Sequence, residues 1–215
     1  HGASHSYVAE TLTELYGSTG KAISCHLGGS GSLCAINDGK SVDTSFGISL
    51  QVGVIQSNRC GDIDPFIVPF LQKEGLSLDE VLDGLTKKGG LLGISGVSND
   101  LRDVQEAADA GNERAKLAID IFCNGIVRHI GAYFAELGGL DHLVFTGGIG
   151  EHGTRIREAV CNQLRHMGVW LDPVRNENCD GGNVVISQED SPVMVHVIPA
   201  NEELGVARKT YSYSL

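Results

Sequence analysis

The segment AISCHLGGSGSLCAINDGKSVDT, residues 22–44, decides the fold class because it contains three short β-like runs separated by two turns. The runs are residues 22–26, 32–36 and 40–44, and the turns between them are glycine-rich or read Asn-Asp-Gly, as hairpin turns do. We therefore predict three consecutive antiparallel strands near the start of the chain.

The second half of the chain predicts helices that alternate with further strands. Apolar residues recur at helical spacing over residues 112–137, and Gly138-Gly139 is a stop signal for that helix. The elements expected after it are a strand over 143–146, a glycine loop over 147–150, a helix through His166, strands over 184–187 and 193–198, and a final helix from about Asn201 to Thr210. Hairpin strands followed by strands that alternate with helices predict an α/β domain with a mixed sheet flanked by helices.

Two shorter helices are predicted between these halves. The acidic, proline-bearing run 62–65 favours a helix start, and that helix ends near Gly75. Ser77 and Glu80 have the spacing of a capping box, which predicts a second helix through Leu85. Residues 46–60 have a mixed pattern that assigns no element.

Composition limits the classes of function. The chain has 215 residues, 41% of them apolar, which favours one large domain with a sizeable core. No apolar run is long enough for a membrane-spanning helix. The formal net charge of −11 opposes binding to nucleic acid and to anionic lipid. We expect a soluble protein whose partners are small molecules.

The six cysteines form no Cys-x-x-Cys pair, so a zinc site and a disulfide framework are both disfavoured. We expect a reducing cytoplasm. The first residues are His1-Gly2-Ala3-Ser4-His5 with no methionine, and we expect this run to lie in the interior of a longer protein.

Two glycine segments suggest phosphate sites. Residues 26–31 follow a strand, and successive backbone amides in such a turn can surround an anion, although glycines also serve simple hairpins. His26 at the strand end is either a phosphate ligand or a hydrogen-bonded structural residue. Residues 147–150 follow a strand and precede a predicted helix, a position that favours an anion.

A rival function rests on the second glycine segment. Gly148, Gly150 and Gly153 spell the pattern G-x-G-x-x-G, and Asp172 follows about twenty residues later, as in a dinucleotide fingerprint. That fingerprint requires the acid at a strand end, and residues 153–172 contain no clear β run. An NAD-dependent oxidoreductase therefore remains the lower-ranked alternative.

Six segments together resemble the acetate kinase family and cover essentially the whole chain. They are HGASH at 1–5, HLGGSGSLCAINDGKSVDTS at 26–45, RCGDIDP at 59–65, GLLGISGVSNDLR at 90–102, GGIGE at 147–151 and IPANEEL at 198–204. The resemblance implies a ribonuclease-H-like α/β domain, as in actin, hexokinase and the Hsp70 ATPase. It also implies that residues 1–215 are the carboxyl-terminal nucleotide-binding and dimerisation domain, and that the amino-terminal domain is absent.

The resemblance implies roles for individual residues. His1 matches the histidine near the transferring phosphoryl group, and Arg59 matches the arginine that stabilises its charge. Read alone, Arg59 favours a surface ion pair with Asp62 or Asp64. Glu202 matches the carboxylate that helps to hold Mg²⁺, although it could also be a helix-start acid, as could Glu203. The nucleotide would be bound by His26, Leu27, Gly28, Gly29 and Ser30, by Asp100, Leu101 and Arg102, and by Gly148, Ile149, Gly150, Glu151 and His152.

The chain departs from the family wording near these sites. Gly29 and Ser30 replace an Asn-Gly pair, and His152 replaces an asparagine. Residues 47–62 lack the usual proline and glutamate, with Asn58 and Cys60 at altered positions. These changes bear on nucleotide and substrate preference.

The resemblance implies reversible transfer of the γ-phosphoryl group of Mg-ATP to acetate by a homodimeric enzyme. Propionate or butyrate is an alternative acceptor if Val52, Val54 or Ile55 reshapes the pocket. A non-catalytic nucleotide-binding module is a further alternative. Because the family draws some catalytic groups from the absent domain, we expect this chain alone to bind nucleotide weakly and to turn over poorly.

Overall fold

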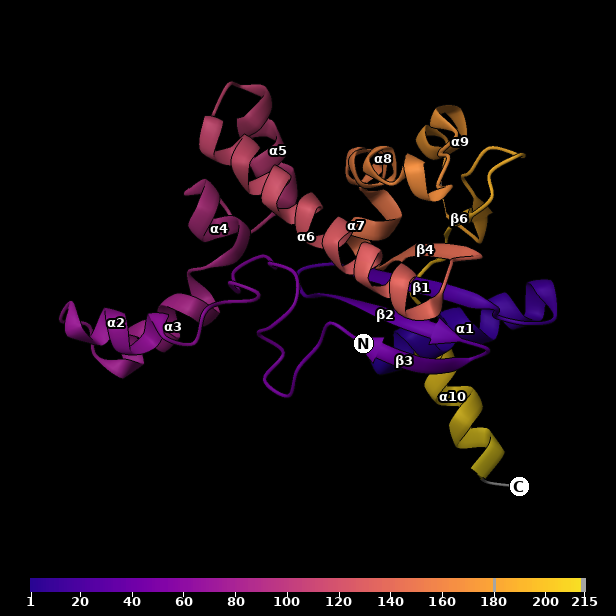
Figure 1. Ribbon diagram of the computed structural model, residues 1–215, viewed down its shortest axis with the longest axis horizontal. Helices are drawn as coiled ribbons and strands as arrows, with labels where there is room; N and C mark the ends of the chain where they lie inside the picture. The colour runs from indigo at the N-terminus through magenta and orange to yellow at the C-terminus, as the bar shows by residue number, and fades with distance from the viewer. Residues whose placement is uncertain (180, 214–215) are drawn as a thin grey trace. The chain divides into compact units, whose positions relative to one another are not determined.

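The computed structural model describes residues 1–179 and 181–213 (Figure 1). The chain divides into two compact units, which are described separately below. The first contains residues 1–27, 32–44 and 127–215, and the second contains residues 28–31 and 45–126. The long helix α6, Glu113–Leu137, contributes residues to both units.

The first unit is built on a six-stranded sheet with the strand order β3-β2-β1-β4-β6-β5. Strands β1 and β4 pair in parallel, as do β4 and β6, whereas β2 with β3 and β5 with β6 are antiparallel. The strands are β1 Lys21–Leu27, β2 Gly31–Asn37, β3 Lys40–Thr44, β4 His142–Thr146, β5 Val184–Val185 and β6 Met194–Val197. This confirms the predicted α/β class with a mixed sheet flanked by helices.

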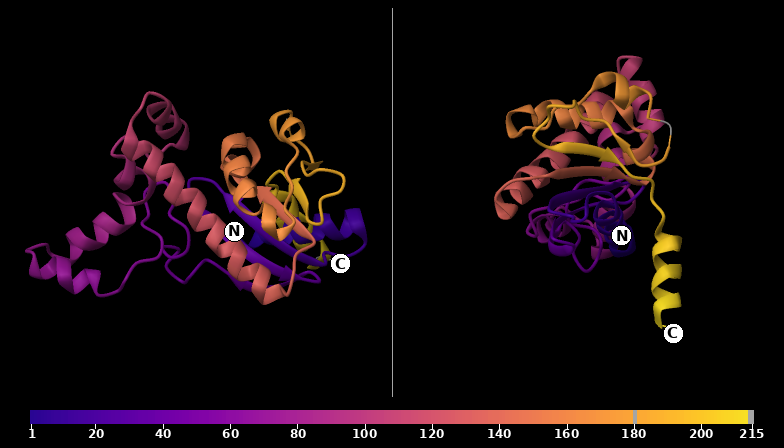
Figure 2. Two further views of the ribbon diagram at one scale, coloured as in Figure 1. Left: turned by 45° about the horizontal axis from the view of Figure 1, so that its top comes forward. Right: turned by 90° about the vertical axis from the view of Figure 1, so that its right-hand side faces the viewer.

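Helices accompany this sheet within the first unit, as two further views show (Figure 2). They are α1 Gly2–Tyr16, α7 Gly147–His152, α8 Thr154–Gln163, a 3-10 turn at Arg165–Met167, α9 Pro173–Glu177 and α10 Glu202–Tyr213. The second unit contains α2 Ile67–Lys73, α3 Leu78–Lys87, α4 Gly90–Ser95 and α5 Leu101–Asp109. No helix in the described part of the chain combines the length and apolarity needed to span a bilayer.

The strand period of two divides the sheet into two faces. On one face Ala22, Cys34, Ile36 and Val144 form a buried cluster with apolar residues of α1. On the other face Cys25, which is fully buried, lies close enough to Cys161 of α8 to affect its ionisation. On the face that packs against α1, the residues of β1 that come after Ala22 are Ser24 and His26, and both have polar side chains.

The prediction for the glycines after β4 was wrong in one respect. Residues 147–152 form the short helix α7 and not an open loop, and the next helix, α8, ends at Gln163 before the 3-10 turn. Gly147 starts α7 with φ +76°, and a Cβ there would meet the carbonyl oxygen of Leu27 at 2.8 Å. Glycine therefore permits α7 to begin against the end of β1.

Candidate functional site

Three histidines and their serine partners form a compact polar cluster in the first unit. The rings of His1 and His26 are 4.2 Å apart between centroids, and His5 lies 6.4 Å from His26. His1 is the N-cap of α1, His5 lies one turn further along, and His26 is near the end of β1. The cluster thus gathers at the end of β1 where α1 begins.

Serine hydroxyls lie within hydrogen-bonding distance of ring nitrogens of all three histidines. Ser4 Oγ lies 2.8 Å from His26 Nδ1, and Ser32 Oγ lies 2.7 Å from His1 Nδ1 and 2.9 Å from His5 Nε2. The reading of His26 as a hydrogen-bonded structural residue is therefore supported, and it does not exclude ligand contact through the other ring nitrogen. The sequence argument assigned no role to the serines.

Burial keeps two of these imidazoles neutral. Burial, with a smaller contribution from neighbouring positive charge, lowers the pKa of His5 to about 3 and that of His26 to about 4. Neutral imidazoles can donate or accept hydrogen bonds but add no positive charge. Attraction for an anion at this cluster must come from N–H groups and from cations elsewhere.

Glu202, the candidate metal ligand, lies beside the cluster. It is the first residue of α10, its carboxylate oxygen is 3.9 Å from His26 Nδ1, and its side chain is 46% exposed. No group of three His, Cys, Asp or Glu side chains in the described residues forms a ready-made metal cage. A single half-exposed carboxylate suits Mg²⁺, which keeps several waters and takes further oxygens from substrate phosphates. Glu202 therefore fits that ion.

Helix α7 carries the five candidate nucleotide residues that follow β4. Gly148 is exposed, whereas Gly150 is buried, and Glu151 Oε1 accepts a 2.9 Å hydrogen bond from the backbone amide of Ala200. Thr146, immediately before α7, is fully buried and its hydroxyl has no hydrogen-bond partner in the described structure. Buried polar atoms without partners are rare, and a water or a ligand is one kind of group that can satisfy them. Ile149 and His152 lie on the same short helix.

Arg157 of α8 stabilises α7 through hydrogen bonds to its backbone carbonyls. It is fully buried, and its guanidinium donates to the carbonyl oxygens of Gly150 at 2.9 Å and Glu151 at 2.7 Å. It also donates to Asn176 Oδ1 at 2.7 Å and to the Asn176 carbonyl at 2.9 Å. A buried arginine whose partners are neutral carbonyls is unusual, because its desolvation is offset only by hydrogen bonds. The sequence argument missed this residue.

The second unit contains the glycine turn 28–31 and Arg59. Arg59 Nη1 donates to Ser30 Oγ at 3.2 Å, to Gln56 Oε1 at 3.1 Å and to the carbonyl of Leu50 at 3.3 Å. Within the described residues no ion pair joins Arg59 to Asp62 or to Asp64. The surface ion-pair reading is therefore wrong, and the guanidinium is held by neutral oxygens.

Some backbone groups of the glycine turn 28–31 are already hydrogen-bonded within the second unit. The amide of Gly28 donates to the Ser30 carbonyl at 3.0 Å, and the Gly29 carbonyl accepts from Ser57 at 3.3 Å. Leu27, just before the turn, is fully buried and offers only its backbone. Ser30 Oγ donates to Gln56 Oε1 at 2.8 Å. Ser30, which stands where the family has glycine, thus ties the turn to the segment that carries Arg59.

Asp100 and Arg102 of the second unit bond to each other. Asp100 is the N-cap of α5, and its carboxylate accepts from the Arg102 amide at 2.9 Å and from Arg102 Nη2 at 2.6 Å. These bonds to Arg102 lower the pKa of Asp100 to about 2. Leu101 between them is buried. This pair presents an exposed guanidinium plane held in one orientation.

Other candidate residues find structural roles. Asp172 is the N-cap of α9 and accepts from Val174 and Arg175, so it is not a ribose-binding acid at a strand end. Gly148 and Gly150 lie inside α7. The dinucleotide fingerprint therefore lacks the strand context that it needs. Among the proposed pocket residues, Val54 is buried and Val52 is 39% exposed.

Comparison with known proteins gives a single family. The family model described as the acetokinase family matches residues 1–208. An acetate kinase of Dictyoglomus thermophilum is 50% identical over 214 residues, which are 98% of this chain and 53% of that protein.

Solved structures agree with this. Porphyromonas gingivalis acetate kinase matches 99% of this chain and 54% of its own, with 41% identity and a TM-score of 0.94. A propionate kinase from Francisella tularensis matches 97% of this chain and 54% of its own, with 38% identity and a TM-score of 0.90. The chain spans about half the length of the relatives it matches. On this evidence the chain belongs to the acetokinase family.

Proposed function

We propose that this chain is the carboxyl-terminal, nucleotide-binding part of a kinase that transfers the γ-phosphoryl group of Mg-ATP reversibly to acetate, giving acetyl phosphate and ADP. The observation that carries the proposal is the cluster of His1, His26 and Glu202, together with the unpartnered hydroxyl of Thr146 before α7. Phosphoryl transfer needs positioned donors and charge neutralisation more than covalent chemistry. The imidazoles and the Thr146 hydroxyl supply hydrogen-bond donors, whereas neutralisation of the phosphate charge must come from cations such as Mg²⁺, which Glu202 would help to hold.

Different residues of the chain are proposed to bind the transferring phosphoryl group, the other phosphates and Mg²⁺. In the first unit, His1 is proposed to donate a hydrogen bond to an oxygen of the transferring group. In the second unit, the Arg59 guanidinium is proposed to bind phosphoryl oxygens through two parallel N–H groups. His26 and Ser30 orient the phosphates at the two ends of the 26–30 segment. When bound, Mg²⁺ would be held partly by Glu202, through water, and would supply neutralisation of phosphate charge.

The adenosine is proposed to lie on the exposed side of α7, around Gly148. The Asp100–Arg102 pair of the second unit is proposed separately as a contact for the nucleotide. Gly148 has no atom within 4 Å of an added Cβ, so its missing side chain leaves open space at the surface. His152 in place of the family's asparagine alters the donors available to the base. Arg157 holds the carbonyls of α7 and thereby fixes the shape of this surface.

Acetate is the proposed acceptor because many relatives bear that name, although one similar solved structure is a propionate kinase. One methylene changes discrimination by only about 1–3 kcal/mol, so the choice depends on small differences in pocket volume. A kinase of propionate or butyrate is the second candidate, and the exposed Val52 is the residue to vary.

A phosphotransfer assay tests this function. The 215-residue chain, alone and joined to the amino-terminal half of the Dictyoglomus thermophilum relative, is incubated with Mg-ATP, acetate and hydroxylamine, and acyl hydroxamate is measured. We expect little product from the chain alone and clear turnover from the joined protein, lost on Arg59→Leu and retained in Arg128→Leu. Absence of turnover in a folded joined protein that still binds Mg-ADP would leave a non-catalytic module, and the kinase proposal would fail.

A further inference from the structure

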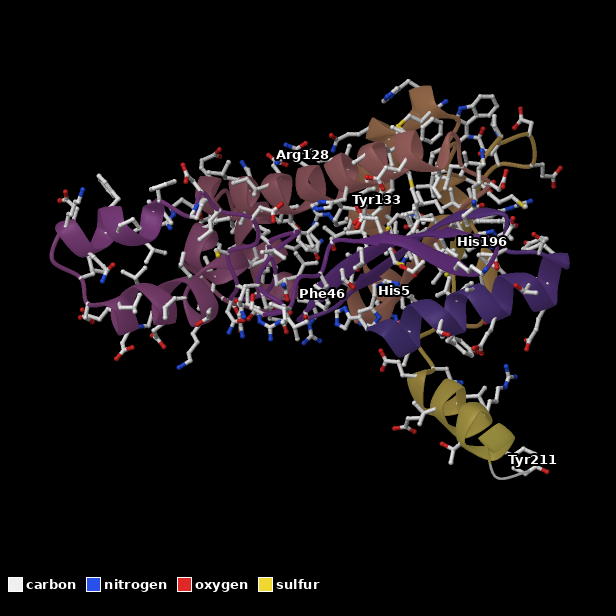
Figure 3. The ribbon with its side chains drawn as sticks, turned by 60° about the horizontal axis from the view of Figure 1, so that its bottom comes forward. His5, Phe46, Arg128, Tyr133, His196 and Tyr211 are labelled. Atoms are coloured by element: carbon white, nitrogen blue, oxygen red, sulfur yellow. The ribbon has the colours of Figure 1, made fainter. Side chains whose placement is uncertain are left out.

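A line of four side chains in the first unit ends at the proposed catalytic histidine. Ser24 Oγ lies 2.9 Å from His5 Nδ1, His5 Nε2 lies 2.9 Å from Ser32 Oγ, and Ser32 Oγ lies 2.7 Å from His1 Nδ1. His5 belongs to α1, while Ser24 and Ser32 belong to β1 and β2, so the line crosses from sheet to helix and back. Figure 3 labels His5 near the amino end of α1.

The direction of the hydrogen bonds in this line can be deduced from Ser24. Its side chain is fully buried, and His5 Nδ1 is its one side-chain hydrogen-bond partner in the described structure. A serine hydroxyl has one proton to donate, and burying that proton without an acceptor costs more than leaving a lone pair idle. Ser24 therefore donates to His5 Nδ1.

The remaining protons follow in sequence. His5 is 7% exposed and neutral, so with Nδ1 accepting, its single proton is on Nε2 and is donated to Ser32 Oγ. Ser32 is fully buried, and its own proton is then directed to its second partner, His1 Nδ1. Neutral His1 must accept at Nδ1 and carry its proton on Nε2.

We propose that His5 and Ser32 are positioning residues that fix the tautomer of His1, so that its Nε2 is always a hydrogen-bond donor toward a phosphoryl oxygen. The functional part rests on the proposed phosphotransfer, whereas the tautomer is a property of the chain itself. His1 held in this way does not act as a base through Nδ1, because that nitrogen is already occupied.

The nearby pair of Ser4 and His26 provides a matched control. Ser4 is as buried as the serines of the line, and its hydroxyl lies 2.8 Å from His26 Nδ1, a ring that is not part of the line. Removing Ser4 therefore perturbs the same cluster without breaking the line.

Nuclear magnetic resonance with ¹⁵N-labelled histidine tests the proposal on the 215-residue chain. Two-bond nitrogen–proton correlations, recorded well above the ordinary imidazole pKa, identify which ring nitrogen carries each proton. We expect Nε2–H for both His5 and His1. A proton on His5 Nδ1 in the wild-type chain would overturn the proposal without the need for any variant.

Variants test the coupling between the residues. Ser32→Ala and His5→Phe remove the constraint, and in each a substantial fraction of His1 should carry its proton on Nδ1. His5→Gln, which keeps a donor near the Nε2 position, and Ser4→Ala should leave the proton of His1 on Nε2. A His1 tautomer that is the same in all four folded variants would show that the line is merely structural.

Addition of Mg-ADP separates this inference from the proposed function. If the tautomers are as expected and His1 resonances also shift on titration with Mg-ADP, both stand. If the tautomers are as expected but His1 does not respond, the positioning line stands and the phosphate role of His1 fails. If His5 or His1 carries its proton on Nδ1 but the His1 resonances still shift with Mg-ADP, the positioning line fails and the phosphate role of His1 stands.

Discussion

Arg157 is the side chain whose loss we expect to cost most. Its fully buried guanidinium is matched only by neutral oxygens of α7, Thr154 and Asn176. Arg157→Met would leave several carbonyl groups buried and unsatisfied, so we predict a loss of roughly 3 kcal/mol or more in the free energy of unfolding, measured with urea. Arg128→Met, at an exposed position of α6, should change it by less than about 0.5 kcal/mol. Equal effects of the two substitutions would refute the buried-clamp description.

The buried histidines predict how stability depends on pH. Burial lowers the pKa of His5 to about 3, and of His26 and His196 to about 4, from the ordinary 6.5. Between these values the unfolded chain binds more protons than the folded one, so the free energy of unfolding should fall as pH falls from 6.5 toward 4. The stability from these groups is fully present above pH 6.5.

His196 allows this pH dependence to be tested at one site. His196, on β6, has its Nε2 3.0 Å from His142 Nδ1, and its ring centroid lies 5.6 Å from that of Tyr16; Figure 3 labels it. His196→Gln should reduce the slope of unfolding free energy against pH by up to about 1.4 kcal/mol per pH unit. His166→Gln, at an exposed site, should leave the slope unchanged. An unaltered slope in His196→Gln would contradict the assignment.

Among the elements, α3 shows a local sequence signal that the structure reproduces. Ser77 accepts from the Glu80 amide at 3.3 Å, and Glu80 accepts from the Ser77 amide at 2.8 Å. We predict that Ser77→Ala lowers the free energy of unfolding by about 1 kcal/mol, while Ser77→Asn, which keeps a capping oxygen, loses much less. Urea unfolding monitored by helix content would measure both, and an equal loss for the two would contradict a capping role.

Other elements show why sequence patterns succeed or fail. The helix over 112–137 was predicted correctly because its buried stripe is apolar throughout and Gly138-Gly139 ends it. Helix α1 was not predicted, because Ser4, His5 and Thr11 on its buried face are polar and hide the helical period. His5 pairs with Ser24 and Ser32, and Ser4 pairs with His26; these partners are strand residues distant in sequence, so the signal for α1 is tertiary.

The candidate site was predictable only in part, because several of its residues matter through contacts with residues that are distant in sequence. His1, His26 and Glu202 were identified through resemblance of short motifs, and the structure brings these three together within one unit. The serine partners and Arg157 carry no local pattern, since their importance arises from burial and from contacts across 19 or more positions in the chain. The roles of all these residues in phosphotransfer remain proposals.

For the whole molecule we expect self-association. Large apolar side chains are exposed on α2 and α3, which lie side by side in Figure 1, and such patches mark interaction surfaces. They are Phe66, 77% exposed, Phe70, 55%, Leu78, 47%, and Leu82, 45%. We predict a dimer by light scattering at micromolar concentration, and a monomer for the double variant Phe66→Glu/Phe70→Glu.

Val206→Glu provides the control for this surface, because Val206 is an exposed apolar residue of α10. It should leave the dimer intact. A monomeric mass for the wild-type chain would contradict the expected dimer, and loss of the dimer in Val206→Glu alone would move the interface to α10.

The central claim is that this chain carries an adenine-nucleotide site on α7, and calorimetric titration with Mg-ADP and, in parallel, NAD tests it most directly. Gly148→Val and Gly84→Val both add a β-branched side chain at a helical position where a Cβ meets no atom within 4 Å, so the intrinsic helix cost is matched between them. We predict that Mg-ADP binds and NAD does not, and that affinity falls about tenfold or more in Gly148→Val but not in Gly84→Val. Binding of NAD alone, no binding of Mg-ADP, or Mg-ADP binding that Gly148→Val leaves unchanged would contradict the account.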